Sequence, residues 1–105
     1  MHGTHAPVTA SVRRYSTLKY HRPTRFTCTA PGARGVYLIG DFNDWNPTAT
    51  PMKRGPGGVW SGNLPLIQGS HHYLFLVDGR PALDPDAQRV DRNETDEKVS
   101  LVIVA

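Results

Sequence analysis

The sequence has 105 residues, 38% hydrophobic content, one cysteine and a formal net charge of +3. This length suffices for one domain and is too short for two. The single Cys28 excludes an internal disulfide and a cysteine-based metal site. No apolar stretch approaches the roughly 18 residues of a membrane span, and no signal peptide is visible, so we expect a cytoplasmic protein outside the membrane.

The charges are unevenly distributed along the chain. Residues 1–40 contain six basic residues and no acid, whereas residues 41–105 contain six basic residues and all nine acids. Residues 1–20 also lack hydrophobic periodicity, so we predict a basic arm over 1–20 and a domain over 21–105. The arm could be solvated, dock on an acidic surface of a second copy, or bind nucleic acid. Nucleic acid is the least favoured partner, because aromatic residues do not alternate with the basic ones.

Short apolar runs between glycine and proline turns predict an all-β fold. The first run is 25–30, where Phe26, Cys28 and Ala30 alternate with polar residues as in a half-buried strand. Further strands are predicted at 36–40, 59–66, 71–77 and 99–104.

The segments between these runs carry turn signals. Residues 41–58 form a long loop with prolines and glycines throughout. Asp78-Gly79 predicts a tight hairpin turn, followed by a short returning strand that Pro81 restricts to a sheet edge. Residues 86–98 are interpreted as a charged connection. Six to eight short strands of this kind predict an immunoglobulin-like β-sandwich.

Three of the predicted strands are apolar on both faces. In 71–77 one face carries aromatic residues and the other carries Leu74 and Leu76. A sandwich needs only one apolar face per sheet. We therefore expect the outer face with His72, Leu74 and Leu76 to be covered by the arm, a second copy or another domain.

The sequence offers little support for an active site. Ser61 lacks the glycine spacing of a nucleophile elbow. Residues 41–46 resemble the start of a calcium loop, but Trp45 takes its fifth position and the closing glutamate is missing. His71 and His72 point to opposite faces of a strand, so they cannot hold one ion together and are expected at the surface. We predict no metal, no cofactor and no enzymatic activity in this chain.

Trp45 stands in a loop rich in Asp and Asn. An indole face can stack on the apolar C–H face of a pyranose while neighbouring polar groups bind the hydroxyls. Alternatively, the ring folds back as a lid on the end of the sandwich. If Trp45 is a sugar platform, the candidate groups around it are Asn43, Asp44, Asn46 and Lys53.

Several segments together resemble the family-48 carbohydrate-binding modules. This family includes N-terminal domains of isoamylases and glycogen-branching enzymes and the glycogen-binding domain of the AMP-activated protein kinase β subunit. The resemblance covers about residues 24–104 and implies an early-set immunoglobulin-like domain that binds α-1,4-glucans such as glycogen or starch without catalysis. It also implies that Trp60 packs in or near the core. The matching motifs are G-D-F-N-D-W at 40–45, G-V-W at 58–60, H-x-Y-x-F-x-V-D-G at 71–79 and D-P at 84–85.

The resemblance is incomplete at the family's sugar-binding positions. Trp45 matches the loop tryptophan, but Leu74 replaces a lysine, and Arg80-Pro81 stands where a second tryptophan is expected. The family's sugar-binding asparagine on the last strand would fall near Lys98 or Val99, and neither residue is an asparagine. One stacked ring contributes about 1 kcal/mol beyond its buried area, so the resemblance implies glucan binding of about millimolar affinity at best.

Two alternatives stay open. The chain could be a protein-interaction or regulatory module that uses the His72, Leu74 and Leu76 face for a partner or a homodimer. It could also be an accessory domain of a family-13 glycoside hydrolase.

Overall fold

The computed structural model describes residues 21–105, and the predicted arm over 1–20 lies outside this range. Within residues 21–105, no helix has the length and apolar character that crossing a membrane requires. The elements in chain order are β1 (His21–Thr29), β2 (Val36–Gly40), η1 (Asp41–Asn43), β3 (Lys53–Arg54), η2 (Pro56–Gly58), β4 (Val59–Ile67), β5 (Gly69–Val77), β6 (Arg80–Ala82), β7 (Arg89–Arg92) and β8 (Lys98–Val104).

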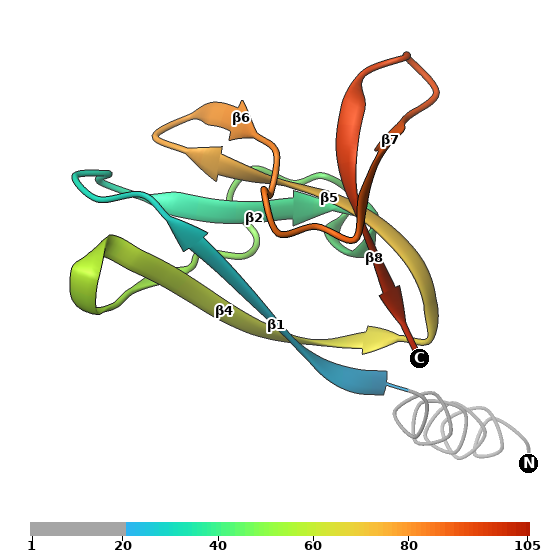
Figure 1. The fold of residues 1–105 in the computed structure, drawn as a ribbon, viewed down its shortest axis with the longest axis horizontal. Helices are drawn as coiled ribbons and strands as arrows, with labels where there is room; N and C mark the ends of the chain where they lie inside the picture. Colours follow the sequence, from blue (N-terminus) through green and yellow to red (C-terminus); the bar gives the residue numbers. More distant parts are fainter. Residues whose placement is uncertain (1–20) are drawn as a thin grey trace, which may run out of the picture.

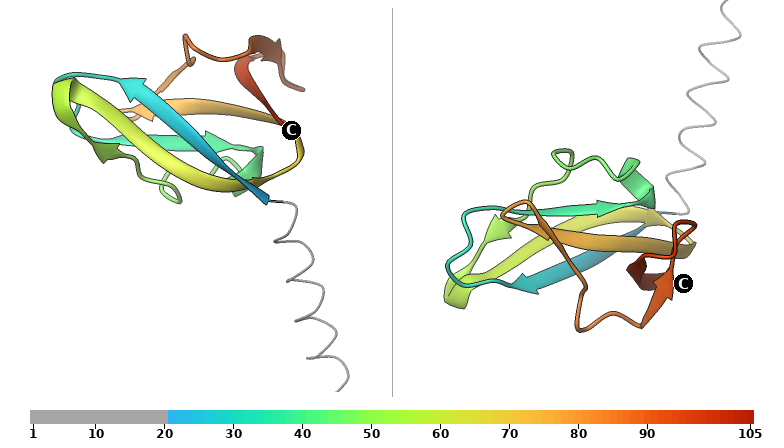
Figure 2. Two further views of the ribbon diagram at one scale, coloured as in Figure 1. Left: turned by 60° about the horizontal axis from the view of Figure 1, so that its bottom comes forward. Right: turned by 90° about the horizontal axis from the view of Figure 1, so that it is seen from above.

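The strands form two antiparallel sheets (Figure 1). One sheet has the order β1-β4-β3, and the other has the order β2-β5-β8-β7, with β6 also paired with β5. Figure 2 shows β1 and β4 as one layer, with β2 and β5 in the layer that faces it. The predicted all-β, immunoglobulin-like sandwich of six to eight strands is confirmed.

Aromatic side chains from both sheets fill the core. Phe26 of β1 and Trp60 of β4 face Tyr73 and Phe75 of β5, and none of the four is more than 6% exposed. The rings of Phe26 and Tyr73 meet edge to face with their centroids 4.9 Å apart. Such a pair contributes about 0.5–1.5 kcal/mol beyond area burial. The packing role expected of Trp60 is confirmed.

A buried polar contact fixes the segment after β6 to the middle of the sandwich. The Tyr73 hydroxyl donates to a carboxylate oxygen of Asp84 over 2.6 Å, and the Asp84 main-chain N–H donates to the Ser100 hydroxyl over 2.9 Å. Burial, and then the Asp84 carboxylate, raise the pKa of Tyr73 far above its usual range. The D-P motif therefore anchors this connection to the core.

The predicted turn after β5 is confirmed. Asp78 has φ 48° and Gly79 has φ 83°, as the two central residues of a type I′ hairpin require. Asp78 also accepts hydrogen bonds from the main-chain N–H groups of Arg34 and Gly35, which joins this turn to the β1–β2 turn. Because β6 pairs only with β5, Pro81 lies on an edge strand as predicted.

Two strands were not predicted from the sequence. β3 has only two residues and lies inside the predicted 41–58 loop, where its pairing with β4 creates it. β7 lies inside the predicted charged connection 86–98. Its residues do not alternate between apolar and polar, and its strand conformation comes from pairing with β8.

The outer face of the five-stranded sheet is only partly exposed. Ile39, Val99 and Leu101 are at most 9% exposed, whereas Leu74 and Leu76 are half-buried. The accessible aliphatic side chains of this face are therefore the two leucines and Ile103 of β8, which is 51% exposed.

Candidate functional site

The residues of the G-D-F-N-D-W motif shape the loop between β2 and β3. A Cβ atom at Gly40 would lie 2.6 Å from the Phe42 ring and 2.7 Å from the His72 carbonyl oxygen. Only glycine fits this close approach. Asp41 accepts a hydrogen bond from the His72 main-chain N–H over 3.0 Å, so the motif is joined to β5 directly after β2 ends.

Asn43 holds the turn closed with both ends of its side-chain amide. Its oxygen accepts from the Gly40 main-chain N–H over 3.0 Å. Its NH₂ group donates to the Leu38 carbonyl over 2.9 Å and to the Thr50 hydroxyl over 3.0 Å. The asparagine therefore connects β2, η1 and the end of the loop.

The backbone at Trp45 has an uncommon conformation. Asp44 and Trp45 have φ values of 57° and 56°, in the left-handed region that residues with a Cβ rarely occupy. The Trp45 main-chain N–H donates to the Gly40 carbonyl over 2.9 Å. A left-handed residue with a Cβ costs about 1–2 kcal/mol, and such strain gathers at functional sites. The motif thus holds one indole ring in a fixed position.

Trp45 forms part of a polar cleft of about 530 Å³ on the side of the five-stranded sheet. The ring is half-buried, so part of its surface faces the cleft. The other residues around the cleft come from the start of η1, from β5 and from the β7–β8 hairpin. They are Asp41, His72, Arg92, Asn93, Glu94 and Thr95.

Hydrogen bonds inside the protein occupy much of the polar wall. His72 Nε2 lies 3.0 Å from Asp91 Oδ2, and Arg89 Nε donates to Asp91 Oδ1 over 3.0 Å. The His72 hydrogen bond, and then the Arg89 hydrogen bond, lower the pKa of Asp91. This arrangement fixes the imidazole against the sheet at the cleft wall.

Two side chains at the cleft rim, those of Glu94 and Arg92, have hydrogen-bonding groups that are free to contact a ligand. Glu94 is exposed and its side chain makes no hydrogen bond or ion pair with another residue in the described part of the chain. Arg92 contacts the carbonyl and carboxylate of Asp96, which leaves several of its five guanidinium donors unused. A free acceptor and free donors therefore stand beside an aromatic ring.

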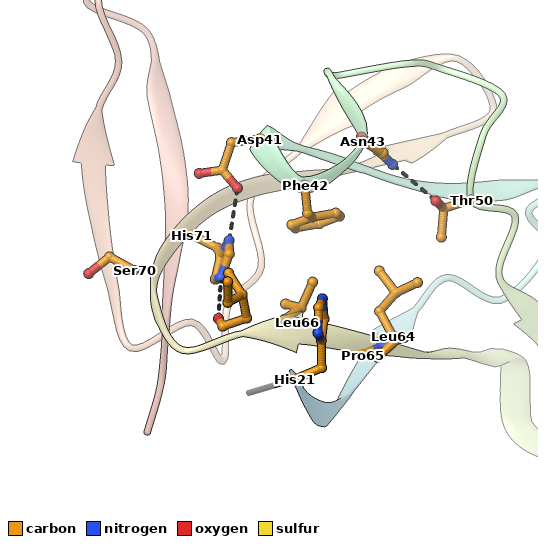
Figure 3. Close-up of a pocket in the computed structure, with 11 residues that line it drawn as sticks. His21, Asp41, Phe42, Asn43, Thr50, Leu64, Pro65, Leu66, Ser70 and His71 are labelled. Atoms are coloured by element: carbon orange, nitrogen blue, oxygen red, sulfur yellow. Dashed lines mark hydrogen bonds and ion pairs between the residues drawn. The ribbon is translucent and has the colours of Figure 1, made fainter. Parts of the chain in front are cut away.

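A second pocket of about 580 Å³, with more aliphatic side chains in its wall, lies on the other side of η1 (Figure 3). Figure 3 shows Phe42 facing Leu64 and Leu66 across this pocket. His71 closes one side, with Nδ1 3.1 Å from Asp41 Oδ1 and Nε2 2.8 Å from the Ile67 carbonyl oxygen. Both imidazole nitrogens of His71 are thus already engaged, and the aliphatic wall suits hydroxyl-rich ligands less well than the Trp45 cleft does.

The expectation of two surface histidines is wrong for His71, which is 9% exposed. Its ring fits between the end of β4 and Asp41, where two acceptors face its two nitrogens. His71 and His72 border different cavities. In the described residues, no group of three or more histidine, cysteine or acidic side chains is placed to hold a metal ion. Cys28 is half-buried, and burial raises the pKa of its thiol.

The structure separates the sugar-site candidates. Trp45 borders the polar cleft, while Asn43 borders the second pocket with its amide fully engaged. Asp44 is exposed on the loop. The Asn46 side chain accepts from the Thr48 N–H and hydroxyl. Lys53 lies on β3, beside a different hollow.

The β7–β8 hairpin was missed as a contributor to the site. Asn93 caps its turn by accepting from Thr95 and from the Glu97 main-chain N–H. Such Asx capping is typical of turns, so the Asn93-Glu94-Thr95 stretch was the available signal. His72, expected on the interaction face, also lies at the cleft.

Comparison with known proteins gives one matching family. The model of carbohydrate-binding module 48, the isoamylase N-terminal domain, matches residues 15–94. The chain is 36% identical over 89 residues to a 1,4-alpha-glucan branching enzyme of Corynebacterium glutamicum, covering 78% of this chain and 12% of that protein. It is 45% identical over 67 residues to the enzyme of Cupriavidus pinatubonensis, and 38% identical over 65 residues to that of Xanthomonas campestris pv. campestris, each covering 59% of this chain and 9% of the relative. The chain therefore spans about a tenth of the length of these curated relatives.

Proposed function

The chain belongs to the carbohydrate-binding module 48 family, and on that basis we propose that its Trp45 cleft binds α-glucan chains without catalysis. The observation that carries the proposal is the half-buried indole at the wall of a polar cleft. The relatives are named for action on 1,4-alpha-glucan, which favours this substrate class.

The chemistry of the cleft suits a neutral sugar polymer. The indole face stacks on the C–H face of one glucose ring, while the Glu94 carboxylate accepts from hydroxyls and the Arg92 guanidinium donates to them. Asp41 and Glu94 carry negative charge and Arg92 carries positive charge, so the cleft does not favour an anion. With a single aromatic platform, the expected dissociation constant is about millimolar.

Isothermal titration with maltoheptaose tests the proposal. Trp45→Ala removes the platform and should abolish measurable binding, whereas Trp45→Tyr keeps an aromatic face and should retain much of the affinity. The β-linked chain cellohexaose is the matched ligand control. Unchanged maltoheptaose binding by the Trp45→Ala protein would rule out this site.

The half-buried Leu74 and Leu76 favour a second candidate function. Leu76 pairs with Tyr37 on β2 and with Pro81 on β6, and Leu74 pairs with Ile39. We propose this apolar face as the alternative, a surface for a second copy of the chain. Light scattering tests it, since Leu74→Asp should convert a dimer into a monomer; a wild-type monomer at high concentration contradicts it.

The matched part covers only 9–12% of the length of these relatives, and this favours a third role. We propose that the chain serves as a glucan-binding accessory part beside an enzyme that acts on the same polymer. The size of the native gene product on an immunoblot tests whether the two are joined in one polypeptide.

A further inference from the structure

His72 belongs both to the wall of the Trp45 cleft and to a hydrogen-bond chain on the sheet. It lies on β5, borders the cleft, and its side chain is 35% exposed. Its Nε2 atom lies 3.0 Å from Oδ2 of Asp91 on β7, and β8 lies between these two strands. One ring nitrogen is therefore held by the protein, while the side chain remains accessible from the cleft.

The partner of Nε2 determines where the ring carries its proton. A carboxylate accepts hydrogen bonds and donates none. The other oxygen of Asp91 accepts from Arg89 Nε over 3.0 Å, and this positive neighbour favours the ionised carboxyl. We therefore assign the proton of the neutral His72 imidazole to Nε2, which leaves Nδ1 with a lone pair.

The Nδ1 atom of His72 is not engaged by the protein. Within residues 21–105, no hydrogen bond or ion pair involves this atom. The main-chain N–H of His72 is already used, since it donates to Asp41 Oδ2 over 3.0 Å. The polar atom that His72 offers to a ligand is therefore Nδ1, an acceptor that needs an O–H or N–H group opposite it.

This acceptor differs from the two other free groups at the cleft. Arg92 offers donors only, and Glu94 offers a charged acceptor in the exposed turn between β7 and β8. His72 adds a neutral acceptor whose ring is already oriented by Asp91. A group that is held in place before binding loses less conformational freedom when the ligand arrives, so His72 suits recognition of one particular hydroxyl.

We propose that His72 Nδ1 accepts a hydrogen bond from a hydroxyl of the glucan in the cleft, and that Asp91 is the positioning residue that orients the imidazole for it. The inference rests on the proposed function, because it assigns a recognition residue within the same cleft. It gives the hydrogen-bond chain from Arg89 through Asp91 to His72 a role in binding as well as in holding β7 to the sheet.

NMR of the imidazole nitrogens tests the position of the proton and the contact with the ligand. The full 105-residue chain is labelled with ¹⁵N and measured at about pH 8, where histidine is mostly neutral. In the free protein, Nε2 of His72 should carry the proton and Nδ1 should be bare. Maltoheptaose at several times its dissociation constant should shift the Nδ1 resonance and leave Nε2 protonated. A protonated Nδ1 in the free protein, or an Nδ1 resonance that ignores the ligand, overturns the inference.

Two amide substitutions separate the two nitrogens of the ring. His72→Asn can place its carbonyl oxygen near the position of Nδ1 and gives up the contact with Asp91. His72→Gln can place its NH₂ group near the position of Nε2, which keeps that contact and gives up the acceptor. Maltoheptaose affinity should fall about three- to tenfold in the His72→Gln protein and less than about twofold in the His72→Asn protein. The opposite order would mean that His72 acts only through Asp91, and it overturns the inference.

The outcomes distinguish this inference from the proposed function. If Trp45→Ala abolishes binding while His72→Gln keeps wild-type affinity, the glucan site stands and the role of His72 is overturned. If binding ignores Trp45→Ala but still shifts Nδ1, the indole platform is overturned and the hydrogen bond to His72 is supported. Circular dichroism verifies the fold of each variant, and the nitrogen spectra of the wild-type protein decide the question even where a variant does not fold.

Discussion

The two tryptophans of this domain lie in opposite surroundings. Trp60 is 6% exposed, its indole N–H donates to the Ala30 carbonyl over 3.2 Å, and the Arg54 guanidinium carbon lies 5.0 Å from its ring centroid. Trp45 is half-buried, has a positive φ and borders a polar cleft. An indole ring therefore has two roles in this domain: the ring of Trp60 packs inside the sandwich, and the ring of Trp45 forms a platform in a loop.

The difference teaches which neighbours matter for each role. The ring of Trp60 is held by apolar contacts across the core, whereas the position of Trp45 depends on hydrogen bonds of Gly40 and Asn43 in its own loop. Substitutions around Trp60 should therefore change stability, and substitutions around Trp45 should change binding.

The largest expected effect is on stability at the core ring. Trp60→Ala removes a buried indole and leaves a cavity, so the free energy of unfolding should fall by about 3–5 kcal/mol. Urea unfolding followed by circular dichroism measures this. Trp45→Ala is the paired variant, and it should cost less than about 1 kcal/mol, because a half-buried loop ring leaves no core cavity. The backbone strain stays the same, since alanine keeps the Cβ atom. An equal loss of unfolding free energy in the two variants would contradict the assignment of Trp60 to the core and of Trp45 to a binding platform.

The next effect concerns the buried polar contact behind the core. Tyr73→Phe leaves the nearly buried Asp84 carboxylate without its hydroxyl donor, and the free energy of unfolding should drop by about 1–3 kcal/mol. Tyr37→Phe is the matched control, since Tyr37 is half-buried and its hydroxyl makes no hydrogen bond to the described residues. Denaturation curves that coincide for the two variants would argue against a stabilising role of the Tyr73 hydroxyl.

A smaller effect on stability, with a clear effect on binding, is expected at Asn43. Asn43→Ala breaks three hydrogen bonds of the motif and should cost about 1–2 kcal/mol. Maltoheptaose affinity should fall as well, although Asn43 lies outside the cleft, because the loop no longer fixes Trp45. Asn63→Ala, at an exposed asparagine, should leave both quantities unchanged. Full affinity in the Asn43→Ala protein would show that the platform does not depend on this clamp.

The sequence predicted the parts of the molecule in which local pattern and tertiary structure agree. The Asp78-Gly79 turn and the alternation around Phe26 follow from turn chemistry and period-two patterning. The burial of Trp60 was implied by the resemblance to the family. β3 and β7 could not be predicted, because pairing with β4 and β8 creates them from segments without strand character. The cleft could be predicted only in part. Trp45 stood out, but the hairpin that brings Glu94 to the same cleft is positioned by the long-range pairing of β8 with β5.

The smallest expected effect is the pH dependence at the cleft wall. Hydrogen bonds from His72, and then from Arg89, hold the pKa of Asp91 below its ordinary value of 3.8. A carboxyl with a lowered folded-state pKa adds stability above its unfolded pKa and loses that contribution as pH falls through the folded value. Asp91→Asn should therefore lower the melting temperature at about pH 5, and the difference from wild type should narrow toward about pH 3.

Glu94→Gln is the control for Asp91, since it neutralises an exposed carboxyl on the same hairpin that makes no hydrogen bond or ion pair with residues 21–105. Its melting temperature should follow the wild type at both pH values. An Asp91→Asn difference that stays constant or widens in acid would mean that the carboxylate form is not the one stabilised by His72. Because Asp91 supports His72 at the cleft, the same acid range should weaken maltoheptaose binding before it unfolds the sandwich around Trp60.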